Sequence, residues 1–269
     1  MKFIALCGDK GSPVVTTTAV ALAAAWAGHA ITVEANPAGG DLAIRLRPGG
    51  SALPETPTVL SVATAARAGR EHDPVATHAH ALNSTTGVVP GAVLAEQMAN
   101  IGDWSPLTDA LARCESSVFL DVGHLHSSSP MLRVAAHADL VIAVGRPDMS
   151  SVIRLRERLV RMAPDLAHLR GAAPRLLPLL ITTSRHGAAD VADLHGILAE
   201  TPAKPFVVDC AFLAHDPSGV RRLEAGDEPG GRLSRTELLR TARALTGRLE
   251  SLIGSPATAQ NPSMVGDRR

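Results

Sequence analysis

The chain has 269 residues, of which 45 % are hydrophobic and 19 % are charged, so it can bury the core of one large α/β domain. Lys and Arg total 26, as do Asp and Glu, and the resulting net charge of zero argues against DNA as a partner. Four Phe, two Trp and no Tyr provide little aromatic surface on which single-stranded nucleic acid could stack.

Apolar runs alternate with helical patterns along the chain. They predict an α/β fold with a mostly parallel sheet flanked by helices. The predicted strands are residues 2–7, 30–34, 86–89, 117–121, 139–144, 176–182 and 205–208. The predicted helices are residues 16–27, 57–67, 91–99, 105–113, 130–137, 149–163, 188–199, 217–225 and 234–252. No repeat or linker divides this pattern, so we expect one domain over residues 1–254 and a disordered tail over residues 255–269.

Several classes of protein are excluded by simple patterns. Cys7, Cys114 and Cys210 are too widely separated for a metal framework or a disulfide scaffold. The N-terminus lacks the pattern of a signal peptide, and no apolar stretch is long enough to span a bilayer. We therefore expect a cytoplasmic protein without a transmembrane segment.

The segment after the first predicted strand is typical of a phosphate-binding loop. Strand 3–7 runs into a turn containing glycine, and Thr16 and Thr17 follow at the start of an Ala-rich helix. This layout places a phosphate at a helix N-terminus. Helix capping by the two threonines is an alternative explanation of equal weight. At the position of the phosphate-binding lysine, however, the chain has Val15.

Residues 10–17 resemble the deviant Walker A loop of the MinD/ParA family of P-loop ATPases. The family pattern is lysine, two glycines, any residue, glycine, lysine and two hydroxyl residues. Lys10 falls on the first, signature lysine, which in the family reaches the nucleotide of the partner protomer. Gly11, Thr16 and Thr17 also match the pattern.

Ser12, Val14 and Val15 depart from the family pattern. A β-branched residue such as Val14 resists the positive φ and the close approach to phosphate that glycine permits. Val15 removes the ammonium group that would neutralise phosphate, and a charge-assisted hydrogen bond of this kind contributes roughly 1.5–3 kcal/mol. The resemblance therefore implies a degenerate loop.

Two further segments resemble the switch regions of the family. Residues 34–41 are similar to switch I, where Glu34 keeps the first of two acidic residues and Asn36 occupies the second, water-positioning place. Residues 118–123 resemble the Walker B strand and switch II, with Asp121 as the carboxylate that holds Mg²⁺ through water. The same order of segments extends over about residues 1–252.

Other residues have weaker functional signals. His124 and His126 follow Asp121 and could form part of a metal site, although a polar loop is the simpler interpretation. Residues 205–209 and the loop after them fall where the family wraps the nucleotide base. The strand over residues 179–184 lacks the asparagine that often recognises adenine there.

The resemblance implies a nucleotide-binding positioning or partner-regulating protein with weak or absent ATP hydrolysis. ATP would bind with Mg²⁺, and a homodimer or a heterodimer with a related P-loop protein would form. The cofactor-binding residues so implied are Lys10, Gly11, Ser12, Thr16, Thr17 and Asp121, of which Thr16 and Asp121 would hold Mg²⁺. The alternative is a pseudo-ATPase scaffold that binds a protein partner, for example a secretion or pilus-assembly ATPase, without nucleotide. Val15 and Asn36 replace residues expected for hydrolysis, so the sequence does not decide whether the protein is an active ATPase.

Overall fold

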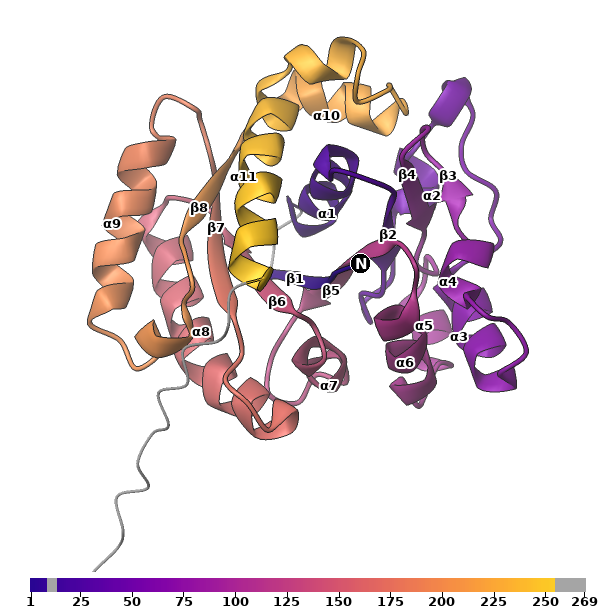
Figure 1. The fold of residues 1–269 in the computed structure, drawn as a ribbon, viewed down its shortest axis with the longest axis horizontal. Helices are drawn as coiled ribbons and strands as arrows, with labels where there is room; N and C mark the ends of the chain where they lie inside the picture. Colours follow the sequence, from indigo (N-terminus) through magenta and orange to yellow (C-terminus); the bar gives the residue numbers. More distant parts are fainter. Residues whose placement is uncertain (9–13, 255–269) are drawn as a thin grey trace, which may run out of the picture.

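The computed structural model describes residues 1–8 and 14–254, which form an eight-stranded sheet covered by helices. The strand order is β3-β4-β2-β5-β1-β6-β7-β8 (Figure 1). All neighbouring strands are parallel except β3 and β4. This confirms the predicted fold class. The predicted tail over residues 255–269 lies outside the described residues.

The strands are β1 Phe3–Gly8, β2 Ala30–Glu34, β3 His80–Ala81, β4 Thr86–Val89, β5 Ser117–His124, β6 Leu140–Gly145, β7 Leu176–Thr182 and β8 Ala211–Ala214. The strand predicted over residues 205–208 is wrong, because Lys204–Phe206 forms a 3-10 turn and the strand begins only at Ala211. Pro205 has no N–H for a strand ladder and favours a turn.

The helices are α1 Val14–Ala25, α2 Leu42–Arg45, α3 Val59–Ala68, α4 Pro74–Thr77, α5 Ala95–Ala99, α6 Ser105–Arg113, α7 Met131–Ala136, α8 Met149–Arg170, α9 Gly187–Ala199, α10 Pro217–Glu224 and α11 Glu237–Gly254. The predicted helix 91–99 is shortened to α5, whereas α8 continues beyond its predicted end at residue 163. The helices α2 and α4 were not predicted, because four residues are too few to show a helical period.

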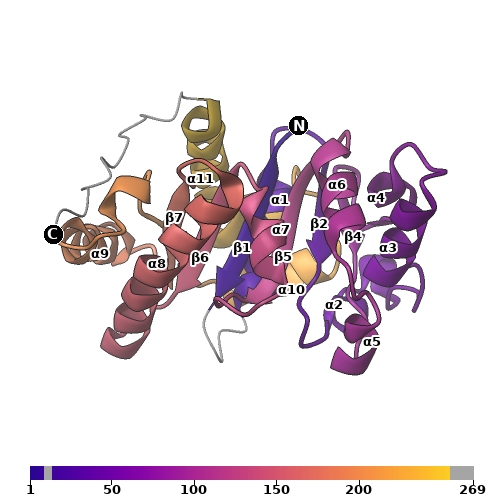
Figure 2. The same ribbon diagram turned by 90° about the horizontal axis from the view of Figure 1, so that it is seen from below.

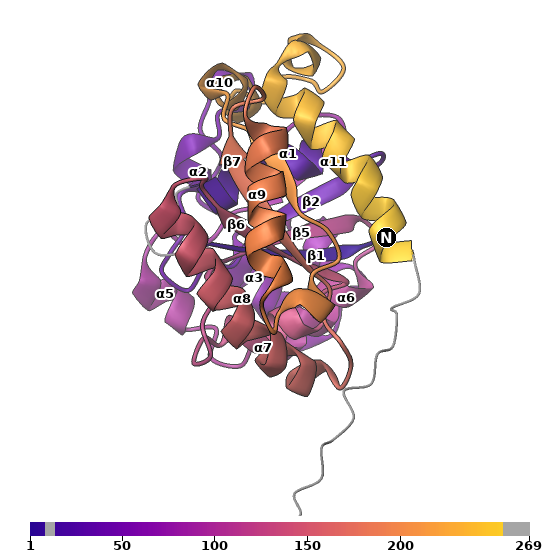
Figure 3. The same cartoon turned by 90° about the vertical axis from the view of Figure 1, so that its left-hand side faces the viewer.

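Two hydrophobic clusters pack on opposite faces of the sheet. Along β1, Ile4 and Leu6 point toward α1, α10 and α11, whereas Phe3 and Ala5 point toward the face covered by α3, α6, α7, α8 and α9. Figure 3 shows α11 and α8 on opposite sides when the sheet is viewed from its β8 edge. Among the described residues, no helix has the length and apolar character needed to cross a membrane.

The carboxyl ends of the central strands meet at one edge of the sheet. Glu34 at the end of β2 is the register partner of Asp121 in β5, and Leu6 of β1 pairs with Asp121 on the other side. In open parallel sheets, ligands bind beyond the carboxyl ends of the strands. Figure 2 shows α2 and α10 at this same end of the molecule. The fold therefore places Thr16, Thr17 and Asp121, the predicted site residues that the structure describes, at one end of the sheet.

Candidate functional site

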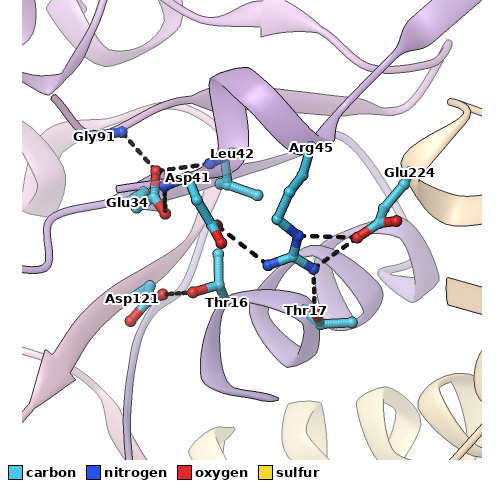
Figure 4. A network of polar contacts seen from close by, with 9 residues as sticks. All are labelled: Thr16, Thr17, Glu34, Asp41, Leu42, Arg45, Gly91, Asp121 and Glu224. Atoms are coloured by element: carbon cyan, nitrogen blue, oxygen red, sulfur yellow. Dashed lines mark hydrogen bonds and ion pairs between the residues drawn. The ribbon is translucent and has the colours of Figure 1, made fainter. Parts of the chain in front are cut away.

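Thr16 and Asp121 are in direct contact at the carboxyl edge of the sheet (Figure 4). Thr16 lies in the first turn of α1, and its hydroxyl donates a hydrogen bond to Oδ2 of Asp121. The backbone N–H of Gly123 donates to Oδ1 of the same carboxylate at 2.8 Å. Burial raises the pKa of Asp121, and these two hydrogen bonds offset part of that rise. The two residues implied as Mg²⁺ ligands thus lie side by side.

This pair of oxygen donors fits a hard cation. Mg²⁺ prefers carboxylate and hydroxyl oxygens, and in nucleotide sites it takes few protein ligands together with phosphate oxygens and water. Asp121 is 1 % exposed, so its ionised form would gain from a cation that replaces the lost hydration. The residues present therefore fit Mg²⁺ shared with phosphate.

Thr17 is bonded to an arginine that the sequence analysis did not identify. Nη2 of Arg45, the last residue of α2, donates to Oγ1 of Thr17 at 2.6 Å. The same guanidinium donates through Nε and Nη2 to Oε1 of Glu224 in α10 at 3.0 and 2.7 Å, and through Nη1 to Oδ1 of Asp41 at 3.2 Å. Figure 4 shows this network beside the Thr16–Asp121 pair. Sequence reasoning missed Arg45 because Glu224 lies 179 positions further along the chain.

Val15 packs into the core. Its side chain is 4 % exposed and belongs to the hydrophobic cluster that α1 forms with α11 and the sheet. The first turn of α1 therefore presents an apolar side chain where the resemblance expects a lysine. The other implied loop residues, Lys10, Gly11 and Ser12, lie outside the described residues.

Glu34 closes the loop that follows β2. Its Oε1 accepts the N–H of Asp41 at 3.0 Å, and its Oε2 accepts the N–H groups of Leu42 and Gly91 at 3.3 and 2.9 Å. Burial raises the pKa of Glu34 to about 7, although these backbone hydrogen bonds act in the opposite direction. The carboxylate thus joins the start of α2 to the end of β4.

Asn36 lies against the backbone that follows Asp121. A Cβ atom on Gly123, whose φ is +63°, would lie 2.2 Å from Oδ1 of Asn36. The same Oδ1 accepts the N–H of Ala38 at 3.0 Å. The segments that resemble switch I and switch II are therefore in van der Waals contact, and a neutral amide occupies the place of the expected acid.

This contact predicts that Gly123→Ala destabilises the protein more than its backbone conformation alone requires. A left-handed alanine costs roughly 1–2 kcal/mol, and displacing Asn36 adds to this cost. We expect a loss of about 3 kcal/mol in the free energy of unfolding, measured by urea denaturation. Gly69→Ala is the matched control, because Gly69 has the same φ of +63° and open space around its Cβ position. If both variants lost the same free energy of unfolding, the proposed effect of the contact between Gly123 and Asn36 would be contradicted.

His124 and His126 do not form a metal centre in the described part of the chain, where no group of three or more candidate ligands occurs. Nη2 of Arg158 lies 2.8 Å from Nε2 of His124, and since arginine only donates, this nitrogen accepts. Arg158 also donates to the carbonyl oxygen of Leu125 at 2.5 Å. Arg158 therefore reaches from α8 to the end of β5.

The expectation for residues 205–209 is also wrong. The N–H of Val208 donates to the carbonyl oxygen of Leu176 at 3.0 Å, and Leu176 is the first residue of β7. This segment therefore lies near the amino end of β7, away from the carboxyl edge. It is the loop at His215 and Asp216, after β8, that reaches the carboxyl edge of the sheet.

No protein-family model matches the sequence, and no curated protein matches it either. Solved structures match the fold over nearly their whole length. A ParA family ATPase from Chlorobium tepidum TLS has a TM-score of 0.69 at 13 % identity, covering 92 % of this chain and 98 % of that chain. The cell division ATPase MinD from Pyrococcus furiosus has a TM-score of 0.64 at 16 % identity, covering 93 % and 99 %.

A third similar structure is the septum site-determining protein MinD from Pyrococcus horikoshii OT3, complexed with Mg-ADP. Its TM-score is 0.62 at 16 % identity, and the match covers 94 % of this chain and 97 % of that chain. Identities this low establish a shared fold and leave function to the site itself. The chain has the fold of the ParA and MinD ATPases.

Proposed function

We propose that this protein is a nucleotide-binding switch of the ParA/MinD type that positions or regulates a protein partner, with weak or absent ATP hydrolysis. The contact between Thr16 and Asp121, at the start of α1 and the carboxyl edge of the sheet, carries this proposal. A hydroxyl and a buried carboxylate at a helix N-terminus suit the Mg²⁺ and phosphate groups of a nucleotide.

The residues proposed to hold the nucleotide come from two elements. Thr16 and Asp121 would hold Mg²⁺, and the Thr17 hydroxyl would face a phosphate. Bound Mg·ATP would supply the phosphate charge that distinguishes the two states of the switch. In keeping with the family resemblance, we propose that Lys10, Gly11 and Ser12 complete the loop and that the nucleotide promotes a dimer.

Weak hydrolysis follows from two side chains. Val15 is buried among apolar residues and brings no charge to a phosphate. The Asn36 amide has no basic group, and its Oδ1 is already bonded to the N–H of Ala38. Positioned donors and charges supply most of the catalysis of phosphoryl transfer. The loss of such a charge and such a positioned group is therefore expected to lower the rate of hydrolysis more than it changes the architecture of the site.

Titration calorimetry of the purified protein with Mg·ATP and Mg·ADP tests the proposed function. We expect binding in the micromolar range, with light scattering showing a larger oligomer in Mg·ATP than in its absence. If no heat is observed up to millimolar Mg·ATP, the switch proposal fails.

We predict that phosphate release from Mg·ATP is no faster with the wild-type protein than with Thr16→Ala. The physical reason is that Val15 and Asn36 already remove the charge and the base that hydrolysis needs. A coupled phosphate assay at saturating Mg·ATP measures this rate. Turnover well above that of Thr16→Ala would show that another group replaces them.

A pseudo-ATPase scaffold without nucleotide is the second candidate. The burial of Val15 favours this scaffold, because the side chain packs in the core at a position that would otherwise face phosphate. Under this candidate, Val14→Gly combined with Val15→Lys would not confer Mg·ATP binding, since the pocket itself would be closed. Binding by the double variant alone would show instead an open pocket that lacks its lysine.

A further inference from the structure

The guanidinium of Arg45 lies against the first turns of α1. Nη2 of Arg45 lies 2.6 Å from Oγ1 of Thr17, one residue after Thr16. The first N–H groups of a helix have no partner within the helix and carry partial positive charge, so an anion is favoured there. A guanidinium beside this turn adds a full charge and several donors to the same place.

We propose that Arg45 supplies the positive charge for the phosphate groups of a bound nucleotide, and that Glu224 holds this guanidinium when no anion is bound. The inference rests on the proposed nucleotide binding. In this assignment, an arginine of α2 provides the positive charge that the loop lacks because it has Val15 in place of a lysine. Arg45 is a binding residue in this assignment, and Glu224 is its competitor.

The exposure of the ion pair supports an exchange of partners. The side chains of Arg45 and Glu224 are 25 % and 26 % exposed, so water and small anions can reach both. Ion pairs open to solvent contribute little to stability because water and salt screen them. Phosphate binds a guanidinium through two parallel hydrogen bonds and carries more charge than a carboxylate. Exchange of Glu224 for phosphate is therefore favourable at Arg45.

The donor pattern leaves room for such a ligand. The Nε and Nη2 atoms of Arg45 donate to Glu224 and Thr17, and Nη1 donates to Asp41. Within residues 1–8 and 14–254, the second N–H of Nη1 has no acceptor. Asp41 has a side chain that is 57 % exposed, and its bond to Nη1 is the longest of the set at 3.2 Å. A phosphate oxygen can thus meet an unused donor before Glu224 is displaced.

A purely structural role makes a different prediction. The backbone N–H of Arg47 donates to the carbonyl oxygen of Glu224 at 2.7 Å, so α2 and α10 are joined next to the ion pair. If Arg45 only tethers these helices, removing either charge breaks the same tether and the two variants behave alike. If Arg45 binds phosphate, removing Glu224 frees the guanidinium and the two variants shift affinity in opposite directions.

Calorimetric titration with Mg·ATP of wild type, Arg45→Ala, Arg45→Lys and Glu224→Gln tests the inference. Loss of a charge-assisted hydrogen bond predicts a Kd about ten- to a hundredfold weaker for Arg45→Ala, with a smaller loss for Arg45→Lys. Glu224→Gln should bind Mg·ATP about threefold tighter or more, since its amide competes poorly for the guanidinium. Arg47→Ala is the matched control, because Arg47 is exposed and its substitution removes a nearby positive charge while leaving the contact between Arg45 and Thr17 in place.

The outcomes separate the inference from the proposed function. No binding by wild type up to millimolar Mg·ATP overturns both. Wild-type binding with Arg45→Ala equal to Arg47→Ala overturns the inference alone, as does Glu224→Gln weakened to the level of Arg45→Ala. Thermal unfolding checks the fold of each variant. If Arg45→Ala does not fold, Arg45→Lys and Glu224→Gln still decide, because their predicted shifts have opposite signs.

Discussion

Asp121→Ala is expected to weaken Mg·ATP binding by about a hundredfold or more, since it removes a charged group at the cation site. Its carboxylate is buried and accepts hydrogen bonds from the hydroxyl of Thr16 and the N–H of Gly123. Thr16→Ala removes a neutral donor and should cost about tenfold. Titration calorimetry with Mg·ATP measures both effects.

Matched controls distinguish this loss from general damage. Asp193→Ala removes an exposed carboxylate from α9, and Thr64→Ala removes a helical hydroxyl that donates to the carbonyl oxygen of Leu60. Asp121→Asn keeps the volume of the buried side chain if Asp121→Ala folds poorly. Wild-type affinity in both Asp121 variants would remove this residue from the site.

Acidification should also weaken Mg·ATP binding. Burial raises the pKa of Asp121, so the carboxylate is protonated at a higher pH than an exposed aspartate. Mg²⁺ requires the ionised form. The measured Kd should therefore rise as the pH falls, and the shift should be absent in Asp121→Asn.

Glu34→Ala is expected to lower the free energy of unfolding by about 3 kcal/mol at acidic pH. The substitution leaves the N–H groups of Asp41, Leu42 and Gly91 without their acceptor, and those of Leu42 and Gly91 are buried. An unsatisfied buried donor costs roughly 1–3 kcal/mol. Urea denaturation at pH 5 measures the loss. Glu96→Ala, which removes an exposed carboxylate from α5, is the control.

The wild-type protein should lose stability as the pH rises through this same group. Burial raises the pKa of Glu34 from 4.5 to about 7, so the folded state binds more protons than the unfolded state between these values. The free energy of unfolding then falls by about 3 kcal/mol over this range, at 1.36 kcal/mol for each unit of pKa difference. Glu34→Ala should abolish this slope. An unchanged slope in the variant would assign the pH dependence to another group.

The parts of the fold that were predicted correctly have strong local signals. The run of apolar residues in β1 and the Ala-rich pattern of α1 each specify an element without help from distant residues. The strand predicted over residues 205–208 failed because two apolar segments lie close together, around Pro205 and at Ala211–Ala214. Which of the two segments becomes the strand depends on which can pair with β7 along its length. The register of that pairing cannot be predicted from the sequence of either segment alone.

In the candidate site, too, the residues with local sequence signals were predicted and a residue placed by distant contacts was missed. Thr16 and Thr17 open a predicted helix, Asp121 ends a predicted strand and Asn36 follows another, so chain order places them at one edge of a parallel sheet. By contrast, Arg45 was missed because it stands in a four-residue helix and bonds to groups on two other helices. A guanidinium at the end of a long flexible side chain is placed by its partners, and those partners are distant in sequence.

The sequence by itself determined the α/β class, the edge of the sheet at which the site forms, and the absence of a lysine at Val15. Periodicity and chain order are local properties, and each residue carries them wherever it lies. Only the tertiary structure decided that Val15 is buried in the core, that Glu34 closes the loop before α2, and that Arg45 lies against Thr17. Burial and ion pairing depend on contacts between distant segments, and such contacts form only when the chain has folded.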